Sequence, residues 1–156
     1  MANRYTTELL RVEAGETDLL VEVVAELAAG GGWVNVEPAV DDEERADVPG
    51  IFAWFSARGP QVPVGTFVAG SDRSPASVGI EHGFGRRALT RLTEGQIVTP
   101  RTWVRRQDHP KRGLVWEVNP HEVDAESVVE LLLKATENLC PLPTDGQWTA
   151  AISRLV

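Results

Sequence analysis

The chain has 156 residues and a net charge of −8, with 42% hydrophobic and 24% charged residues, which is ordinary for a soluble globular protein. This length fits a single domain, residues 1–156, that can bury a core without disulfides or a structural metal. The lone cysteine, Cys140, excludes an intrachain disulfide and a multi-cysteine metal site, and it follows an apolar helical pattern that indicates a structural thiol.

The first half of the chain is predicted to form a clear helix and up to four strands. The helix runs from Thr17, a suitable N-cap, to Ala29, where three glycines end it. The preceding stretch, Tyr5 to Val12, fits either a strand or a helix, and we favour the helix. Asp41 to Asp47 has no apolar period and indicates a solvated loop. Strand-like composition recurs at four places, namely Trp33 to Glu37, Ile51 to Phe55, Val64 to Ala69 and Ala76 to Ile80.

The second half is predicted to form a short helix, a hairpin and a long helix. His82 to Gly85, with the sequence HGFG, opens the short helix, which extends to about Thr93. A hairpin is expected around Asp108 to Gly113, where a proline and a glycine suit a turn. The long helix follows the Asp124 cap, and residues 147–155 fit a strand or a helix equally. Together these elements predict an α+β fold, with a mainly antiparallel sheet of about five to six strands and about three helices packed mostly on one face.

Basic residues are concentrated in the middle of this otherwise acidic chain. Residues 81–113 contain eight of the fifteen Lys and Arg residues and only three acidic residues, so this stretch carries a net charge of +5. We call residues 82–112 the basic band. Charge segregated in this way creates a local field that attracts anions or an acidic protein surface. The basic band is therefore the candidate working surface.

The start of the basic band, with the sequence HGFGRR, is the candidate anion site. Gly83 and Gly85 stand just before the predicted helix, and Arg86 and Arg87 occupy its first turn. An anion there would meet backbone N–H groups, the helix dipole and two guanidinium groups, with His82 as a pH-sensitive donor. The spacing lacks the P-loop and dinucleotide-binding patterns, and the alternative is a glycine turn followed by solvated arginines.

Three further arginines complete the candidate ligand-binding set: Arg91 on the predicted helix, and Arg105 and Arg106 on the predicted hairpin. Consecutive residues of a strand point to opposite faces, so Arg105 and Arg106 share one surface only if the strand bulges or lies at an edge. Charges on an edge strand also discourage edge-to-edge pairing, which is an alternative role. A further alternative is that the basic band meets the protein's own acidic ridge, within one chain or across a homodimer. The ridge consists of Asp18, Glu22 and Glu26.

These patterns predict a cytoplasmic, non-catalytic binding protein that engages an anionic small molecule or an acidic protein surface through the basic band. The first residues contain no signal-peptide apolar segment, and no apolar run reaches the roughly 18 residues of a membrane span, so no membrane partner is expected. The net charge of −8 disfavours nucleic acid. We expect no cofactor and no metal, because the chain lacks P-loop, HExxH and EF-hand patterns.

Two alternatives stay open. A small phosphate-handling hydrolase or transferase would use His82 and His109 as general acid and base beside the arginines. A chaperone-like or dimerising module would instead bind proteins through the aromatic segment Ile51 to Phe55. The predicted order of elements and the acidity resemble those of small acidic chaperone-like α+β domains that bind secretion clients.

Overall fold

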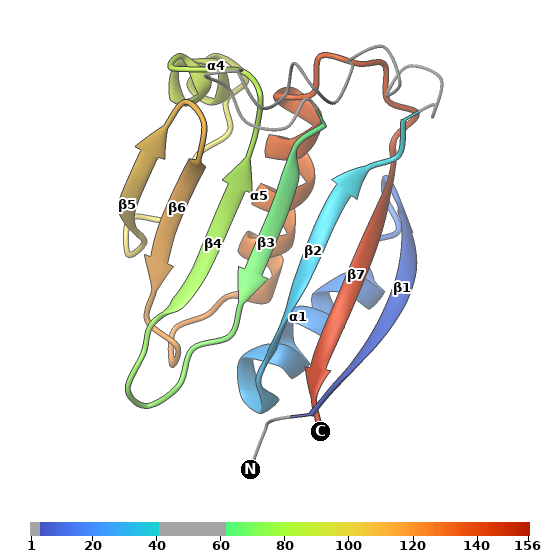
Figure 1. Ribbon diagram of the computed structural model, residues 1–156, viewed down its shortest axis with the longest axis vertical. Coiled ribbons are helices and arrows are strands. Elements are labelled where there is room, and N and C mark those ends of the chain that lie inside the picture. The colour runs from blue at the N-terminus through green and yellow to red at the C-terminus, as the bar shows by residue number, and fades with distance from the viewer. Residues whose placement is uncertain (1–3, 41–61) are drawn as a thin grey trace.

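The computed structural model describes residues 4–40 and 62–156, in which three helices and seven strands form a mixed α+β fold (Figure 1). The predicted fold class is confirmed, although the sheet has seven strands where five to six were expected. The strands are β1 (Tyr5–Glu13), β2 (Gly32–Pro38), β3 (Val64–Val68), β4 (Ala76–Glu81), β5 (Val104–His109), β6 (Gly113–Val118) and β7 (Gln147–Leu155). The helices are α1 (Asp18–Gly30), α4 (Ala88–Glu94) and α5 (Ala125–Asn138).

The strands form one antiparallel sheet in the order β1-β7-β2-β3-β4-β6-β5. β7, the last strand of the chain, lies between β1 and β2 (Figure 1). β3 and β4 form one hairpin, β5 and β6 form another, and β1 and β5 are the two edges of the sheet. The basic band therefore occupies the β5 edge and the chain segments that lead to it.

The segment from Tyr5 to Val12 is a strand, so its assignment to a helix is wrong. Val12 is buried, whereas Leu9 on the other side of the strand is exposed, which follows the two-residue period of a strand. β7 pairs with all nine residues of β1. This pairing joins the two ends of the chain, so local sequence preference could not reveal it.

Helices α1 and α5 pack against each other and against the central strands, and both lie behind the sheet in the view of Figure 1. Gly65 on β3 lets α5 approach closely, because a Cβ there would lie 2.9 Å from the Cδ2 of Leu132. The buried indole of Trp148 on β7 donates a hydrogen bond to the Thr136 hydroxyl of α5, at 3.2 Å. These contacts fix α5 across the middle of the sheet.

Several other predicted elements are confirmed. The helices expected after Thr17 and after Asp124 are α1 and α5, and the expected strands in residues 33–37, 64–69 and 76–80 are β2, β3 and β4. Residues 147–155, which the sequence left undecided, form β7. Asp41 to Asp47 and Ile51 to Phe55 lie outside the described residues. Of the helices in residues 4–40 and 62–156, none has both the length and the apolar character needed to cross a bilayer.

Candidate functional site

The HGFG segment is a turn between β4 and α4, and its histidine is buried. His82 follows β4 directly, its side chain is 0% exposed, and its Nδ1 accepts a hydrogen bond from the Phe84 N–H at 3.2 Å. Its Nε2 is buried and meets no hydrogen-bond partner among the described residues. Burial lowers the pKa of His82, while the charge of Asp108 acts in the opposite direction. The imidazole is therefore inside the turn, away from the surface on which the sequence placed it as a donor.

The residues after His82 expose their arginines. Gly85 adopts a positive φ of 89°, which leads the chain toward α4. Arg86 and Arg87 were predicted in the first turn of this helix, but both lie before it, with Arg87 at the N-cap, and both are exposed. α4 has only 7 residues, so its dipole contributes little to an anion site. Gly83, half-buried between His82 and Phe84, belongs to the same turn.

α4 and the turn of the β5–β6 hairpin lie at the same end of the sheet (Figure 1). Gly113 holds the hairpin turn against the chain just before His82: its φ is 87°, and a Cβ there would lie 2.2 Å from the Ile80 carbonyl oxygen. We call the cations of this end the basic corner. It consists of Arg86, Arg87, Arg91, Lys111 and Arg112, all exposed and none in a salt bridge with another described residue.

The remaining arginines of the basic band are not part of this corner. β5 has an irregularity between Arg105 and Gln107, and Arg105 lies opposite Trp116 of β6, whose side chain is buried. The Nε of Arg106 donates to Glu117 at 2.9 Å, so Arg106 is neutralised on the other face of the hairpin. Arg101 precedes β5 and therefore lies beyond the end of that strand opposite to the hairpin turn. The basic band is thus divided among three places. The basic corner lies at one end of the sheet, Arg105 lies on the face of the hairpin next to Trp116, and Arg106 lies on the opposite face.

Neither histidine of the proposed acid–base pair lines a described cavity. His109 is exposed, and its Nδ1 accepts hydrogen bonds from the N–H groups of Lys111 and Arg112, both at 3.1 Å. His82 and His109 therefore use the same nitrogen in the same way, each to close its own turn. This is a structural role, which engages the atom that a general base would need.

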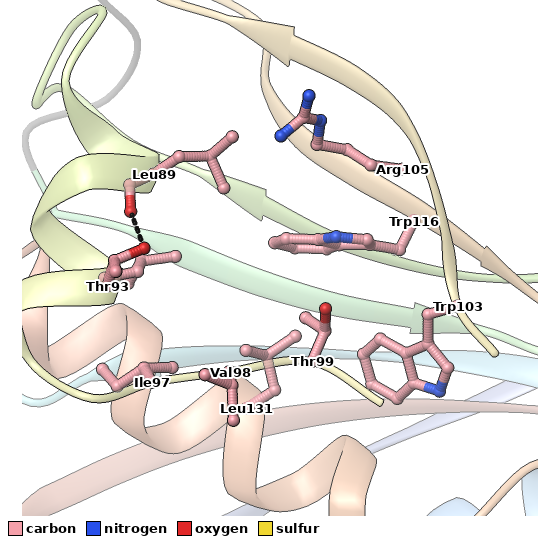
Figure 2. Close-up of a pocket in the computed structure, with 10 residues that line it drawn as sticks. Leu89, Thr93, Ile97, Val98, Thr99, Trp103, Arg105, Trp116 and Leu131 are labelled. Atoms are coloured by element: carbon pink, nitrogen blue, oxygen red, sulfur yellow. Dashed lines mark hydrogen bonds between the residues drawn. The ribbon is translucent and has the colours of Figure 1, made fainter. Parts of the chain in front are cut away.

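Beneath α4 there is a cavity of about 350 Å³ that the sequence did not predict (Figure 2). α4, the segment that follows it, the β5–β6 hairpin and α5 each contribute to its wall. We call it the α4 cavity. Its lining consists of Leu89, Leu92, Thr93, Ile97, Val98, Thr99, Trp103, Arg105, Trp116 and Leu131. The apolar spacing of residues 89 and 92 was visible in the sequence, but the folded position of the two tryptophans was not.

The acidic ridge of α1 does not meet the basic corner in any described salt bridge. Its Glu26 instead accepts a hydrogen bond from Arg154 of β7, at 3.2 Å. Within the described part of the chain, no group of three or more His, Cys, Asp or Glu side chains is arranged to hold a metal ion. Comparisons with protein-family models, with curated proteins and with solved structures each found no significant match.

Proposed function

We propose that this protein is a non-catalytic binding protein whose basic corner engages an acidic surface of a partner protein. The observation that carries the proposal is the charge arrangement at one end of the sheet. Two segments separated in sequence, residues 86–91 and residues 111–112, bring five exposed cations to this end, and none has an ion pair within the described residues.

A protein surface fits this arrangement better than a small anion does. The five cations lie on the turn before α4, on α4 itself and on a hairpin turn, and none of them lines a described cavity that could enclose a small ligand. Exposed charges of one sign act over about 8 Å at physiological salt, and they accelerate association with a surface of opposite charge. The net charge of −8 adds a general repulsion of acidic partners, so only this end of the molecule would attract them.

The positions of the histidines favour binding over catalysis. Catalysis by His82 and His109 would need both imidazoles to reach a common substrate, but His82 is fully buried and His109 is exposed in the hairpin turn. Each also uses its Nδ1 to accept backbone N–H groups. Within residues 4–40 and 62–156, no side chain of the basic corner forms an ion pair, which supports a role in partner binding.

The proposal is tested with poly-glutamate as a mimic of an acidic protein surface, at low and at high salt. Arg86→Ala combined with Arg87→Ala should weaken binding about tenfold, because each exposed pair is worth up to about 1 kcal/mol. Its matched control is Arg11→Ala combined with Arg73→Ala, which removes the same charge from two exposed arginines elsewhere. The control should bind almost as tightly as the wild type.

The melting temperatures of the same variants decide whether the arginines are structural. Neither Arg86 nor Arg87 has an ion pair with a described residue, so the first double variant should melt within about 2 °C of the wild type. A much larger drop would assign these arginines to structural contacts. If both double variants bind poly-glutamate equally weakly, the binding depends on the net charge of the protein and not on the basic corner. Tighter binding of duplex DNA than of poly-glutamate would replace the acidic protein by a nucleic acid.

A further inference from the structure

The α4 cavity combines apolar walls with a single charged side chain. Its volume of about 350 Å³ is at the lower end of the range that small-molecule sites occupy. Trp116 is 3% exposed and Leu131 is 3% exposed, so its floor is part of the packed core. Val98, by contrast, is 80% exposed at the rim. The cavity therefore offers a firm apolar base and an open apolar entrance.

Among the described residues that line the α4 cavity, Arg105 is the only charged one. It lies opposite Trp116 in the β5–β6 register, and Figure 2 shows its side chain above the indole of Trp116, with the guanidinium directed toward α4. Arg105 forms no salt bridge with another described residue. Its positive charge is thus available at the edge of an apolar cavity.

The polar groups opposite Arg105 are few. The Thr93 hydroxyl donates to the Leu89 carbonyl oxygen at 3.0 Å, so its proton is already used within α4 (Figure 2). Thr99 presents a hydroxyl on the far side of the Trp116 ring (Figure 2). No carboxylate from the described part of the chain lines the cavity. One positive charge with no counter-charge in the lining matches a ligand with one negative charge.

We propose that the α4 cavity binds a small monocarboxylate with a compact apolar body, such as an aromatic ring. The carboxylate would accept a forked pair of hydrogen bonds from the Arg105 guanidinium, which is the geometry that favours arginine for carboxylates. The apolar body would replace water along Trp103, Trp116 and Leu131, where ring faces and methyl groups give dispersion contacts. A ligand with two carboxylates would leave one of them against apolar walls, which costs free energy unless a partner is present.

The direct test is a calorimetric titration of the full chain with phenylacetate and, separately, with its neutral analogue phenylacetamide. The wild type should bind phenylacetate, and the amide should bind at least about tenfold more weakly, because it lacks the charge that pairs with Arg105. Arg105→Gln should weaken phenylacetate binding about 10- to 100-fold, which corresponds to the loss of a charged hydrogen bond. The same variant should not discriminate between the acid and the amide.

Arg106→Gln is the matched control. It removes the same charge from the neighbouring residue, but Arg106 faces Glu117 on the other side of the hairpin. Phenylacetate binding should change less than about twofold, since a screened surface charge contributes little. A second variant, Val98→Glu, places a carboxylate at the exposed rim and should weaken phenylacetate more than Val98→Gln does.

Several results would overturn the proposal. The first is that phenylacetate gives no heat of binding. The second is that the acid and the amide bind equally well, and the third is that Arg105→Gln and Arg106→Gln weaken phenylacetate binding to the same extent. Two-dimensional NMR would show where phenylacetate binds, because it should shift the indole N–H signals of Trp103 and Trp116. Shifts confined to other residues would place the ligand outside the α4 cavity. Arg105 is not part of the basic corner, so this test can fail while the poly-glutamate test succeeds, and the reverse also holds.

Discussion

The two halves of the sheet use their charged side chains in different ways. In the β1–β7–β2 half, Arg154 of β7 pairs with Glu8 of β1 and with Glu26 of α1, so one cation joins three elements. In the β4–β6–β5 half, the basic corner has no ion pair among the described residues, and the chain there is positioned by turns. The first half uses charge for stability. Arg106 of β5 does pair with Glu117, but the basic corner obtains its geometry from the backbone, and none of its five charges is paired with a described residue.

The strongest test of this contrast is the glycine that fixes the basic corner. Gly113→Ala should cost about 3 kcal/mol of unfolding free energy, because it adds a strained positive φ to a clash with backbone atoms. The φ is 87°, and the added Cβ would lie 2.2 Å from the Ile80 oxygen. Gly15 in the other half has a φ of 83° but nothing within 4 Å of such a Cβ. Gly15→Ala should therefore cost only about 1 kcal/mol.

Urea unfolding of the two alanine variants measures both losses. The comparison is matched, because both substitutions impose almost the same backbone strain and differ in the space around the new methyl group. A Gly113→Ala variant as stable as Gly15→Ala would mean that the hairpin is not held by its contact with β4. The basic corner would then need another explanation for its position.

The parts of the fold that could be predicted are those in which local chemistry decides. α1 and α5 have an apolar face at helical spacing and an end marked by glycine or proline, and the hairpin turn contains Pro110 and Gly113. The residues of β1 were wrongly predicted as a helix and those of β7 were left undecided, because each strand is defined by the other, from opposite ends of the chain. The strand state of each segment depends on a partner that is distant in sequence, and local sequence preference does not reveal that partner.

The candidate site was predictable in composition but not in arrangement. The charge of residues 81–113 indicated a basic surface, and the structure brings five of its eight cations to one end. Sequence could not show that Arg105 would line a cavity while Arg106 would pair with Glu117, because an irregular strand determines where each one points. It also could not show that His82 is buried, since a histidine beside two glycines has the composition of an exposed turn.

Arg154, which links β7 to β1 and α1, is expected to have an intermediate effect on stability. Arg154→Ala should lower the unfolding free energy by about 1 kcal/mol, because a network of two ion pairs is worth more than one exposed pair. Arg91→Ala in the basic corner should change it by less than about 0.5 kcal/mol. The hydrogen bond to Glu8 is the main cause of the raised pKa of Arg154, which agrees with a cation stabilised by its partners. Thermal unfolding at low and high salt is the measurement, and equal effects of the two variants would remove the contrast between the halves.

The last effect is confined to acidic pH and concerns the buried histidine beneath the basic corner. Burial lowers the pKa of His82 from its ordinary value of 6.5, although Asp108 opposes the shift. As the pH falls, the unfolded chain therefore takes up a proton at His82 before the folded protein does. The contribution of neutral His82 to the unfolding free energy is fully present above about pH 6.5 and is lost as the pH decreases below it.

His82→Asn isolates this effect, because the Asn side-chain oxygen can accept the Phe84 N–H as Nδ1 does, yet it does not titrate. The wild type should lose unfolding free energy faster than the variant as the pH falls from about 8 to 5, measured by urea unfolding. His109→Asn is the control, since it replaces an exposed histidine that closes the neighbouring turn in the same way. Parallel pH profiles of wild type and His82→Asn would mean that His82 is as easily protonated in the fold as in the unfolded chain. The turn beneath the basic corner would then be open to water, and its geometry would not be fixed by the backbone as the comparison of the two halves requires.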